Sequence, residues 1–403
     1  MAYAERLPAS WRARFKKPDG TWGSKSGFAT KEAALNWGEE QEAEVRARIW
    51  IAPEDREIAF EIFAEQWMAS ARLADNTRAK YRCYLDAHIL PKWGKWPLIS
   101  IFNSHVDIQG WVSQLHEDLA EPSVSSVFAL FSTICNSAVR ARRIPANPCN
   151  GIRVTSGDYE TERQVATPAQ VLRAAMRLHH TCGRAGFVLC LLNGYTGARW
   201  SELAGLEPHE YDEVNRAIPV RTPLRETAGR VAKAKRAKTP AGKRWIQLPD
   251  FLAALYTDLL VQAEPGQPVF AGRRGGYLRR GNFRARFWRP AWDGCPGSDQ
   301  AWLRAPILPG FTFNEGRHTH RTWLAEDGVP EVARAARLGH RMRGMGHVYE
   351  HVTPAMRDQV RSALEERWLR SLDALHPQER ERLMEMVPQI GEHYRAHRRK
   401  EAS

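Results

Sequence analysis

Four short segments in the second half of the chain carry side chains suited to chemistry on a phosphate group. These segments are 196–203 (TGARWSEL), 238–244 (KTPAGKR), 314–319 (NEGRHT) and 338–352 (LGHRMRGMGHVYEHV). Their arginines can donate paired hydrogen bonds to the oxygens of an anionic phosphodiester, a geometry that lysine does not reproduce. The last segment also contains a tyrosine, a residue type that can form a covalent intermediate as a nucleophile. Together the four segments favour chemistry on phosphodiester bonds.

Each segment has an ordinary interpretation when it is taken alone. An arginine and a glutamate at the spacing of Arg199 and Glu202 usually form a surface salt bridge worth about 0.2–0.5 kcal/mol. The hairpin expected around Lys238 is then a plain basic turn, and Tyr349 is a half-buried helix residue. Tyr195 precedes the first segment, but it follows an apolar run and is expected in the core. The combination of segments therefore carries the functional interpretation.

In order and spacing the four segments resemble the tyrosine recombinase family of the phage-integrase type. The catalytic domain of that family contains an arginine, a hairpin lysine, an H-x-x-R box, an L-G-H box and a tyrosine shortly afterwards. The resemblance implies a catalytic set made of Arg199, Lys238, Asn314, Arg317, His340 and Tyr349, with Glu202 in support. It further implies that the tyrosine attacks the phosphodiester, which gives a 3′-phosphotyrosyl link and a free 5′ hydroxyl.

The implied roles follow the charge that develops during such an attack. Arg199, Arg317 and His340 would donate hydrogen bonds to the nonbridging oxygens. Lys238 would protonate the departing oxygen, and Glu202 would hold the arginines in place. Three other lysines are close enough in sequence to compete with Lys238, namely Lys233, Lys235 and Lys243. Because a phosphotyrosine keeps the energy of the broken bond, neither ATP nor a metal ion is expected, and no cofactor is predicted.

One position departs from the family pattern. The H-x-x-R box begins with Asn314 instead of histidine. An amide can hydrogen-bond to phosphate, but it cannot exchange a proton near neutral pH. If the family histidine helps to deprotonate the tyrosine, that step needs another group in this chain. His318 and His320 are the neighbouring substitutes to consider.

A multidomain α+β architecture is expected to position these residues. Alternation over 11–15 and a turn at 18–20 predict a β-hairpin, followed by a helix that Thr30 can cap. Helical periodicity then dominates as far as about residue 142, whereas the part with the four segments adds strands at 217–221, 230–235 and 244–248. With the resemblance, the predicted divisions are 1–50 (arm-type DNA-binding domain), 56–153 (all-helical core-binding domain), 154–167 (linker), 168–366 (mixed α/β catalytic domain) and 367–403 (charged helical tail).

The charge of the chain favours a polyanionic partner. Its 59 Lys and Arg residues outnumber 46 Asp and Glu, for a formal net charge of +13, which favours nucleic acid ahead of a membrane surface. Candidates for contact with DNA are Arg12, Arg14, Lys16, Thr77, Arg78, Lys80, Arg236 and Lys243. A solvated basic face is the plainer interpretation of the same residues.

Several other classes of protein are disfavoured. The sequence has no run of about 18 apolar residues and no signal-peptide pattern at its start, so we expect no membrane association and a location in the bacterial cytoplasm. The six cysteines are scattered, without C-x-x-C or zinc-like spacing. Neither a G-x-x-x-x-G-K-[ST] loop nor a G-x-G-x-x-G turn occurs.

The resemblance also implies partners. It implies double-stranded DNA carrying attachment sites, a homo-tetramer on that DNA, a host DNA-bending protein and a small excision factor. Two alternatives stay open, and the first is a catalytically inactive DNA-binding regulator or architectural protein, which the Asn314 change permits. The second is a type IB topoisomerase, which the long helical domain and separate N-terminal part disfavour. The sequence does not distinguish a phage from an integrative element as the source.

Overall fold

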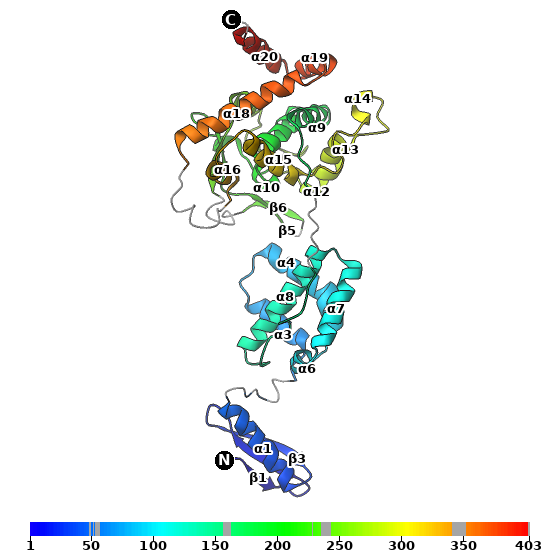
Figure 1. Cartoon of the computed structure of the whole chain (residues 1–403), viewed down its shortest axis with the longest axis vertical. Helices are drawn as coiled ribbons and strands as arrows, with labels where there is room; N and C mark the ends of the chain where they lie inside the picture. The colour runs from blue at the N-terminus through cyan, green and yellow to red at the C-terminus, as the bar shows by residue number, and fades with distance from the viewer. Residues whose placement is uncertain are drawn as a thin grey trace. The chain divides into compact units, whose positions relative to one another are not determined.

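The computed structural model describes residues 1–47, 50, 52, 57–155, 163–227, 229–234, 243–340 and 352–401. These residues belong to two compact units, Met1–Glu160 and Thr161–Ser403, through which the chain can be followed in Figure 1. Small sheets occur beside many helices, so the predicted α+β class is confirmed.

The chain begins with a small antiparallel sheet covered by one helix. Its elements are β1 (Tyr3–Arg6), β2 (Trp11–Lys16), β3 (Trp22–Phe28) and α1 (Lys31–Arg46). The predicted hairpin corresponds to β2 and β3, but β1 was not predicted, because four residues are too few for an alternating pattern to stand out. Phe15 of β2 packs against Trp37 of α1, with ring centroids 5.5 Å apart. Thr30 caps α1 as predicted and accepts a hydrogen bond from the Ala33 backbone N–H at 3.1 Å.

The rest of the first unit is helical and has its own core. Its helices are α3 (Phe60–Ser70), α4 (Asp75–Tyr84), η1 (Leu85–Ile89), α5 (Leu90–Trp93), α6 (Leu98–Phe102), α7 (His105–Asp118) and α8 (Glu121–Arg140). Trp93 is fully buried at the centre, with its ring 5.7 Å from Phe131 and 5.9 Å from Trp111. Among the described helices, α8 alone is long and apolar enough to cross a membrane, and its apolar residues lie in this core.

The second unit surrounds the long helix α9 (Pro168–Thr196). Thr167 and Gln170 form a capping box at its start, and Gly183 interrupts it with a φ of 65°. The other helices are α10 (Trp200–Leu203), η2 (Pro208–Glu210), α11 (Asp250–Val261), α12 (Arg280–Phe283), η4 (Arg284–Trp288), α13 (Arg289–Asp293), α14 (Ala301–Arg304), α15 (Phe313–Glu326), α16 (Glu331–Leu338), α18 (Pro354–Asp373), α19 (Pro377–Met386) and α20 (Pro388–Glu401). Tyr195 is fully buried near the end of α9, which confirms its predicted place in the core.

Two pairs of antiparallel strands complete the second unit. They are β4 (Ala217–Val220) with β7 (Arg244–Gln247), and β5 (Leu224–Thr227) with β6 (Arg230–Lys233). The predicted strands correspond to β4, β6 and β7, whereas β5 was not predicted.

Both ends of the predicted catalytic domain make contacts across the proposed boundaries. In the last part of the predicted linker, Ala166 accepts a hydrogen bond from Trp323 Nε1 at 3.0 Å and donates one to Thr319 Oγ1 at 3.1 Å, so it is held against α15. The boundary predicted at residue 366 falls inside α18. Beyond it, Trp368 stacks on Phe251 of α11 with ring centroids 4.2 Å apart. The start of the predicted tail therefore packs in the core of the second unit.

Candidate active site

Arg199 lies in a tight turn between α9 and α10. The turn depends on Gly197, whose φ of 61° is in the left-handed region that glycine adopts readily. A Cβ at this position would also lie 2.7 Å from Leu338 Cδ2, so space requires glycine as well. Arg199 begins α10 from this turn, and its side chain is 45% exposed. Its guanidinium is thus open to solvent at the edge of the fold.

Arg317 reaches the same place from α15. It donates from Nη1 to the Gly197 carbonyl at 2.8 Å and from Nη2 to the Leu338 carbonyl. Gly316 permits the close approach of α15 to α9, because a Cβ there would lie 1.8 Å from Asn193 Oδ1. Arg317 is 5% exposed, so the protein backbone fixes its guanidinium.

His340 follows a second left-handed glycine, Gly339, which ends α16 with a φ of 65°. The His340 backbone N–H donates to the Ala335 carbonyl at 2.9 Å and closes the helix end. This turn places the ring beside Arg317, whose Nη2 lies 2.8 Å from His340 Nε2. Arginine has no acceptor, so Nε2 must accept, and the proton of the neutral ring is on Nδ1. The exposed His340 ring therefore keeps an N–H donor for a ligand.

Glu202 lies behind Arg199, with its side chain only 6% exposed. It accepts hydrogen bonds from the Arg199 backbone N–H at 2.8 Å and from Arg199 Nη1 at 3.0 Å. Arg244 adds a further bond from Nη2 at 2.9 Å. Burial by itself raises the pKa of Glu202, but the charge and hydrogen bonds of Arg244 and Arg199 outweigh burial and lower that pKa. The interpretation of Glu202 as a surface salt bridge is therefore wrong.

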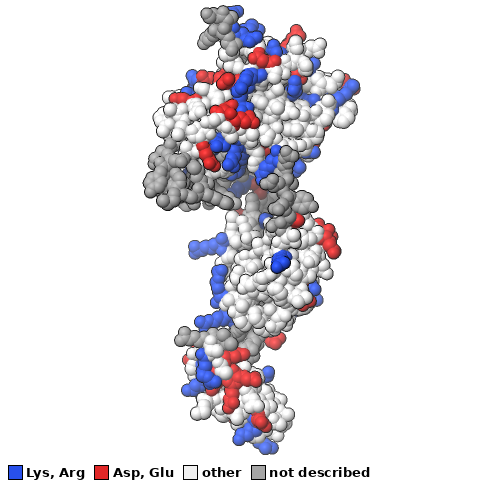
Figure 2. Space-filling model, in the orientation of Figure 1, with Lys and Arg blue, Asp and Glu red and all other residues white. Residues whose placement is uncertain are grey.

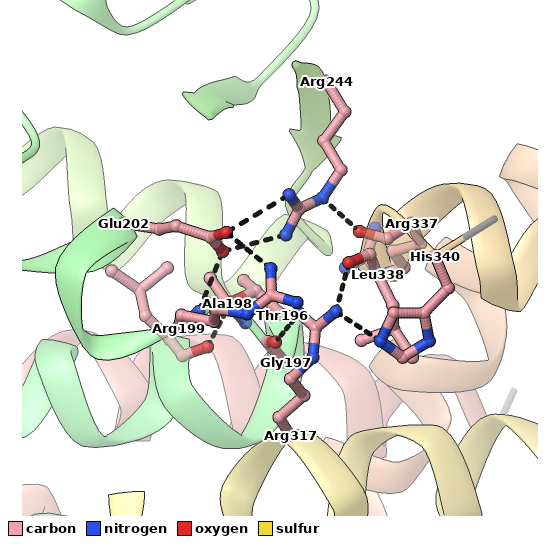
Figure 3. A network of polar contacts seen from close by, with 11 residues as sticks. Thr196, Gly197, Ala198, Arg199, Glu202, Arg244, Arg317, Arg337, Leu338 and His340 are labelled. Carbon is pink, nitrogen blue, oxygen red and sulfur yellow. Dashed lines mark hydrogen bonds and ion pairs between the residues drawn. The ribbon is translucent and has the colours of Figure 1, made fainter. Parts of the chain in front are cut away.

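Arg244 is a member of this network that was not predicted from the sequence. It is the first residue of β7, its side chain is 7% exposed, and its Nε donates to the Arg337 carbonyl at 2.6 Å. Figure 3 shows it between Glu202 and the end of α16. The alternation of side chains along the strand gives the signal, because Arg244 shares a face with the fully buried Ile246, whereas Trp245 is 44% exposed.

Positive charge exceeds negative charge at this site. The guanidiniums of Arg199, Arg244 and Arg317 gather around one carboxylate among the residues drawn in Figure 3. Burial and then the charge of Arg199 lower the pKa of Arg317 to about 9. Burial and then the charge of Arg317 lower the pKa of His340 to about 4, so its ring is neutral at pH 7. An anion bound here would relieve this repulsion, and a phosphodiester has that charge.

Asn314 is exposed on α15, one turn before Arg317. Its Nδ2 lies 3.3 Å from Nε2 of His318, and the Arg163 guanidinium contacts the same ring. Burial, followed by the charge of Arg163, lowers the pKa of His318. A neutral imidazole therefore adjoins the amide that replaces the family histidine.

His320 has a different environment from His318. It is fully buried, its Nδ1 donates to the Gly194 carbonyl at 3.0 Å, and its Nε2 accepts from Arg337 Nε at 3.0 Å. Both ring nitrogens are occupied, so His320 is excluded as a substitute for the missing histidine.

Comparison with known proteins identifies the segment that contains this site. Residues 168–356 match the phage integrase family. The chain carries a phage integrase domain. The whole chain is 24% identical over 362 residues to a prophage phiRv2 integrase of Mycobacterium tuberculosis, and the match covers 88% of this chain and 92% of that relative. This match bears out the resemblance to tyrosine recombinases of the phage or mobile-element type.

Two solved structures share the fold of this chain. The Tn1549 transposon integrase in complex with a circular intermediate DNA has a TM-score of 0.58 and 22% identity, covering 76% of this chain and 98% of that chain. A lambda integrase tetramer bound to a Holliday junction has a TM-score of 0.52 and 14% identity, covering 87% of this chain and 99% of that chain. The similarity to these two structures extends over both units, so it also includes residues before 168, where the family match begins.

Three predicted site residues, Arg236, Lys238 and Tyr349, lie outside the residues that the structure describes. Their placement and roles stay predictions. Lys233, a competitor of Lys238, is engaged elsewhere, since its Nζ lies 3.0 Å from Glu207 and 2.9 Å from Glu210. Lys243 is exposed directly before β7.

Glu207 and Glu210 also belong to the group that most resembles a metal site in the described part of the chain. With His209 they place ligand atoms within 4.8 Å of one another. The Lys233 ammonium already bridges the two carboxylates. The charge that would attract a cation is thus offset by a side chain.

The predicted DNA contacts in the first unit differ in how exposed and how paired their side chains are. Arg12, Arg14 and Lys16 alternate along β2 with the buried Ala13 and Phe15, so they share the outer face of the sheet. Glu5 on β1 shares this face and lies 3.6 Å from Arg12 and 3.5 Å from Arg14.

The candidates for DNA contact on α4 also differ in how available their side chains are to a ligand. Arg78 donates to the carbonyls of Met68 and Ala71 and thus completes the end of α3. Lys80 is exposed over the Tyr84 ring, and Thr77 is half-buried. Figure 2 shows lysine and arginine side chains along one edge of the helical part, beside a visible face with little charge. Lys80 is thus more available to a ligand than Arg78.

Proposed function

We propose that this protein is a site-specific DNA recombinase, an integrase that cleaves and religates DNA through a 3′-phosphotyrosine at Tyr349. The observation that carries the proposal is the unbalanced positive charge formed by Arg199, Arg317 and Arg244 around Glu202, with the His340 donor beside it. A scissile phosphate supplies the missing negative charge. The transition state of its transfer gains more from these donors than the ground state does.

In the proposed reaction each side chain has one role in cleavage and the reverse role in religation. The Tyr349 oxygen forms a bond to phosphorus while the bond from phosphorus to the 5′ oxygen breaks. Arg199, Arg317 and the Nδ1–H of His340 donate to the nonbridging oxygens. Lys238 gives its proton to the departing 5′ oxygen. Religation reverses these steps with the 5′ hydroxyl of the partner strand as the nucleophile, so no ATP is consumed.

The proton of Tyr349 needs an acceptor, since Asn314 cannot take it. His318 is the neighbouring group that has a lowered pKa and lies within 3.3 Å of the Asn314 amide. We assign Asn314 to hydrogen bonding with the phosphate and His318 to proton acceptance through a water molecule.

A nicked suicide DNA substrate tests the proposal. The short strand released by cleavage diffuses away, so a covalent protein–DNA adduct should accumulate and be visible on a denaturing gel. Tyr349→Phe should abolish the adduct, whereas Tyr211→Phe and Tyr277→Phe should retain it. A folded protein that binds the DNA without ever forming an adduct would instead support the alternative of a DNA-binding regulator. Sequencing the adducts from a DNA library would identify the attachment site.

The N-terminal sheet is proposed to bind arm-type DNA through the outer face of β2. Replacing Arg12, Arg14 and Lys16 together by glutamine should weaken binding to duplex DNA and reduce the slope of its salt dependence by about 0.9 for each phosphate that is no longer neutralised. A matched pair on α1, Lys31→Gln with Arg46→Gln, should change neither quantity. Equal effects of the two sets would show that net charge, and not this face, determines binding.

The proposed assembly is a homo-tetramer on two DNA duplexes, by analogy with the lambda integrase tetramer on its Holliday junction. A host DNA-bending protein and an excision factor complete the proposed partners. We place the reaction in the bacterial cytoplasm, where the DNA of a prophage or integrative element lies.

A further inference from the structure

Arg244 occupies the centre of the site although the family resemblance gives it no role. Its Nη2 lies 2.9 Å from Glu202 Oε2 and its Nη1 lies 3.4 Å from Glu202 Oε1. Its Nε donates to the Arg337 carbonyl at 2.6 Å. One planar side chain therefore connects β7 with α10 on one side and with the end of α16 on the other (Figure 3).

We propose that Arg244 is a positioning residue for strand cleavage. It directs the Arg199 guanidinium toward the scissile phosphate by way of Glu202, and it fixes the turn that carries His340. The inference rests on the recombinase function proposed above and adds to it a residue that never touches the DNA.

Burial separates the task of Arg244 from that of Arg199. The Arg244 side chain is 7% exposed, whereas that of Arg199 is 45% exposed. A phosphodiester approaching from solvent can meet Arg199, but it cannot meet Arg244 without displacing other groups. Arg244 can therefore act on the reaction only through the groups that it holds.

Glu202 is the first of these groups, because the two arginines share its carboxylate. Oε1 accepts from Arg199 Nη1 at 3.0 Å, while Arg244 approaches both carboxylate oxygens. Arg244 thereby offsets much of the carboxylate charge and leaves the Arg199 guanidinium free to face a phosphate. Without Arg244, the buried carboxylate would pair with Arg199 alone and draw it inward.

The Arg337 carbonyl is the second group, and it leads directly to Arg317 and His340. The next carbonyl along the chain, that of Leu338, accepts from Arg317 Nη2. The ring of His340 accepts from the same nitrogen at 2.8 Å. A shift of Arg337 would thus move two partners of Arg317 together.

The geometry requires arginine and not merely a positive charge. Three of the five N–H bonds of Arg244 point in two directions from one rigid plane, two toward Glu202 and one toward the Arg337 carbonyl. The ammonium of lysine is a single point charge at the end of a flexible chain, so it cannot hold both partners in a fixed direction. Arg244→Lys should therefore keep the charge and lose the positioning.

Single-turnover cleavage of the nicked suicide substrate by the full-length protein tests the inference. Arg244→Gln should slow adduct formation on the order of 10- to 100-fold, as is typical when a side chain that orients a functional group is removed. Arg244→Lys should recover little of this rate. The Kd for the DNA should not change for either variant, because Arg244 does not face the DNA.

A double-mutant cycle with Arg199→Lys distinguishes positioning from general damage to the fold. If Arg244 acts through Arg199, then Arg244→Gln should have little further effect on the rate once Arg199 is replaced. A purely structural defect would instead multiply the two losses, both in this cycle and in the same cycle with His340→Gln, and that result would overturn the inference. Thermal melting of each variant confirms that folded proteins are compared, and Arg244→Lys takes the place of Arg244→Gln in the cycle if the latter does not fold.

Wild-type protein and a surface variant complete the design. Arg370→Gln should cleave at the wild-type rate, since Arg370 is 59% exposed with ion pairs of 3.8 Å and 3.9 Å. If the wild type forms no adduct, the proposed function fails. If the wild type cleaves and both Arg244 variants cleave equally fast, the proposed function stands and the positioning role of Arg244 fails.

Discussion

At the scale of single residues, the site combines buried and exposed cations with different tasks. Arg317 and Arg244 are held by backbone carbonyls and by Glu202, while Arg199 and His340 present donors to solvent. Fixed donors need little reorganisation when charge develops in the transition state, which is the main source of electrostatic catalysis. The repulsion within such a set is visible in the lowered pKa values of Arg317 and His340.

The state of His340 gives a prediction about pH. Its folded pKa of about 4 lies below the unfolded value of about 6.5 for histidine. The folded state therefore favours the neutral ring, and this contribution to stability is present above about pH 6.5 and is lost as the pH falls toward 4. NMR of histidine-labelled protein should show a neutral His340 with its proton on Nδ1 at pH 7.

Comparison with His340→Gln isolates this effect. The loss of unfolding free energy between about pH 6.5 and 4 should be smaller in the variant than in the wild type. His320, whose pKa is also lowered by burial, contributes in both proteins and so cancels in the comparison. A His340 ring that titrates near 6.5 would contradict the assignment.

At the scale of elements, the site depends on how closely α15 approaches α9. The side chain of Asn193 on α9 donates to the Phe313 carbonyl at 2.8 Å, directly beside Gly316. Gly197 ends α9 in a left-handed turn that places its carbonyl against Arg317. Gly197 and Gly316 thus set the distance between the elements that carry Arg199 and Arg317, the two arginines proposed to bind the phosphate.

Gly316→Ala should disturb both the fold and the reaction. Its Cβ would lie 1.8 Å from Asn193 Oδ1, so either the Asn193 side chain must give up its bond to the Phe313 carbonyl, or α15 must move away from α9 and carry Arg317 with it. We expect a loss of about 1–3 kcal/mol in the free energy of unfolding, the usual range for overpacking, together with slower adduct formation. Chemical denaturation and the suicide-substrate assay measure the two effects.

Gly281→Ala in α12 is the matched control for this substitution. No atom lies within 4 Å of a Cβ built at Gly281, so the change should be neutral or stabilising by up to about 1 kcal/mol. Equal stability of the two variants would mean that the interface of α9 with α15 is looser than described.

At the scale of the molecule, the C-terminal segment is part of the second core. Leu364, Trp368 and Leu372 are buried at helical spacing on α18, on both sides of the boundary predicted at residue 366. Leu383 of α19 and Ile390 of α20 extend the same core. Several charged residues of this segment, among them Arg370, Glu381 and Arg395, are exposed on the same helices.

Trp368→Ala tests this view of the C-terminal segment. The tryptophan is 1% exposed and stacks on Phe251, so its removal should cost about 3–5 kcal/mol of unfolding free energy. Arg370→Gln, two residues further along the helix, should change stability by less than about 1 kcal/mol. An unchanged melting temperature for Trp368→Ala would show that the segment is independent of the core.

The sequence by itself predicted the α+β class and the resemblance to phage integrases, and it singled out Arg199, Glu202, Arg317 and His340, which the structure brings together. The residues could be predicted because their motifs are local in the sequence. The fold class could be predicted because helical and alternating patterns indicate which face of an element is apolar. The predicted strand after the Lys238 hairpin was found as β7 for the same reason. Local patterns, however, carry no information on which distant elements meet.

Only the tertiary structure decided which of these residues work together and what surrounds them. It buried Glu202, placed Arg244 between α10 and α16, and occupied both ring nitrogens of His320. It also joined the segment after residue 366 to the core through Trp368. The physical reason is that burial and charge pairing depend on contacts between elements distant in the sequence, which only the packing of the whole unit determines.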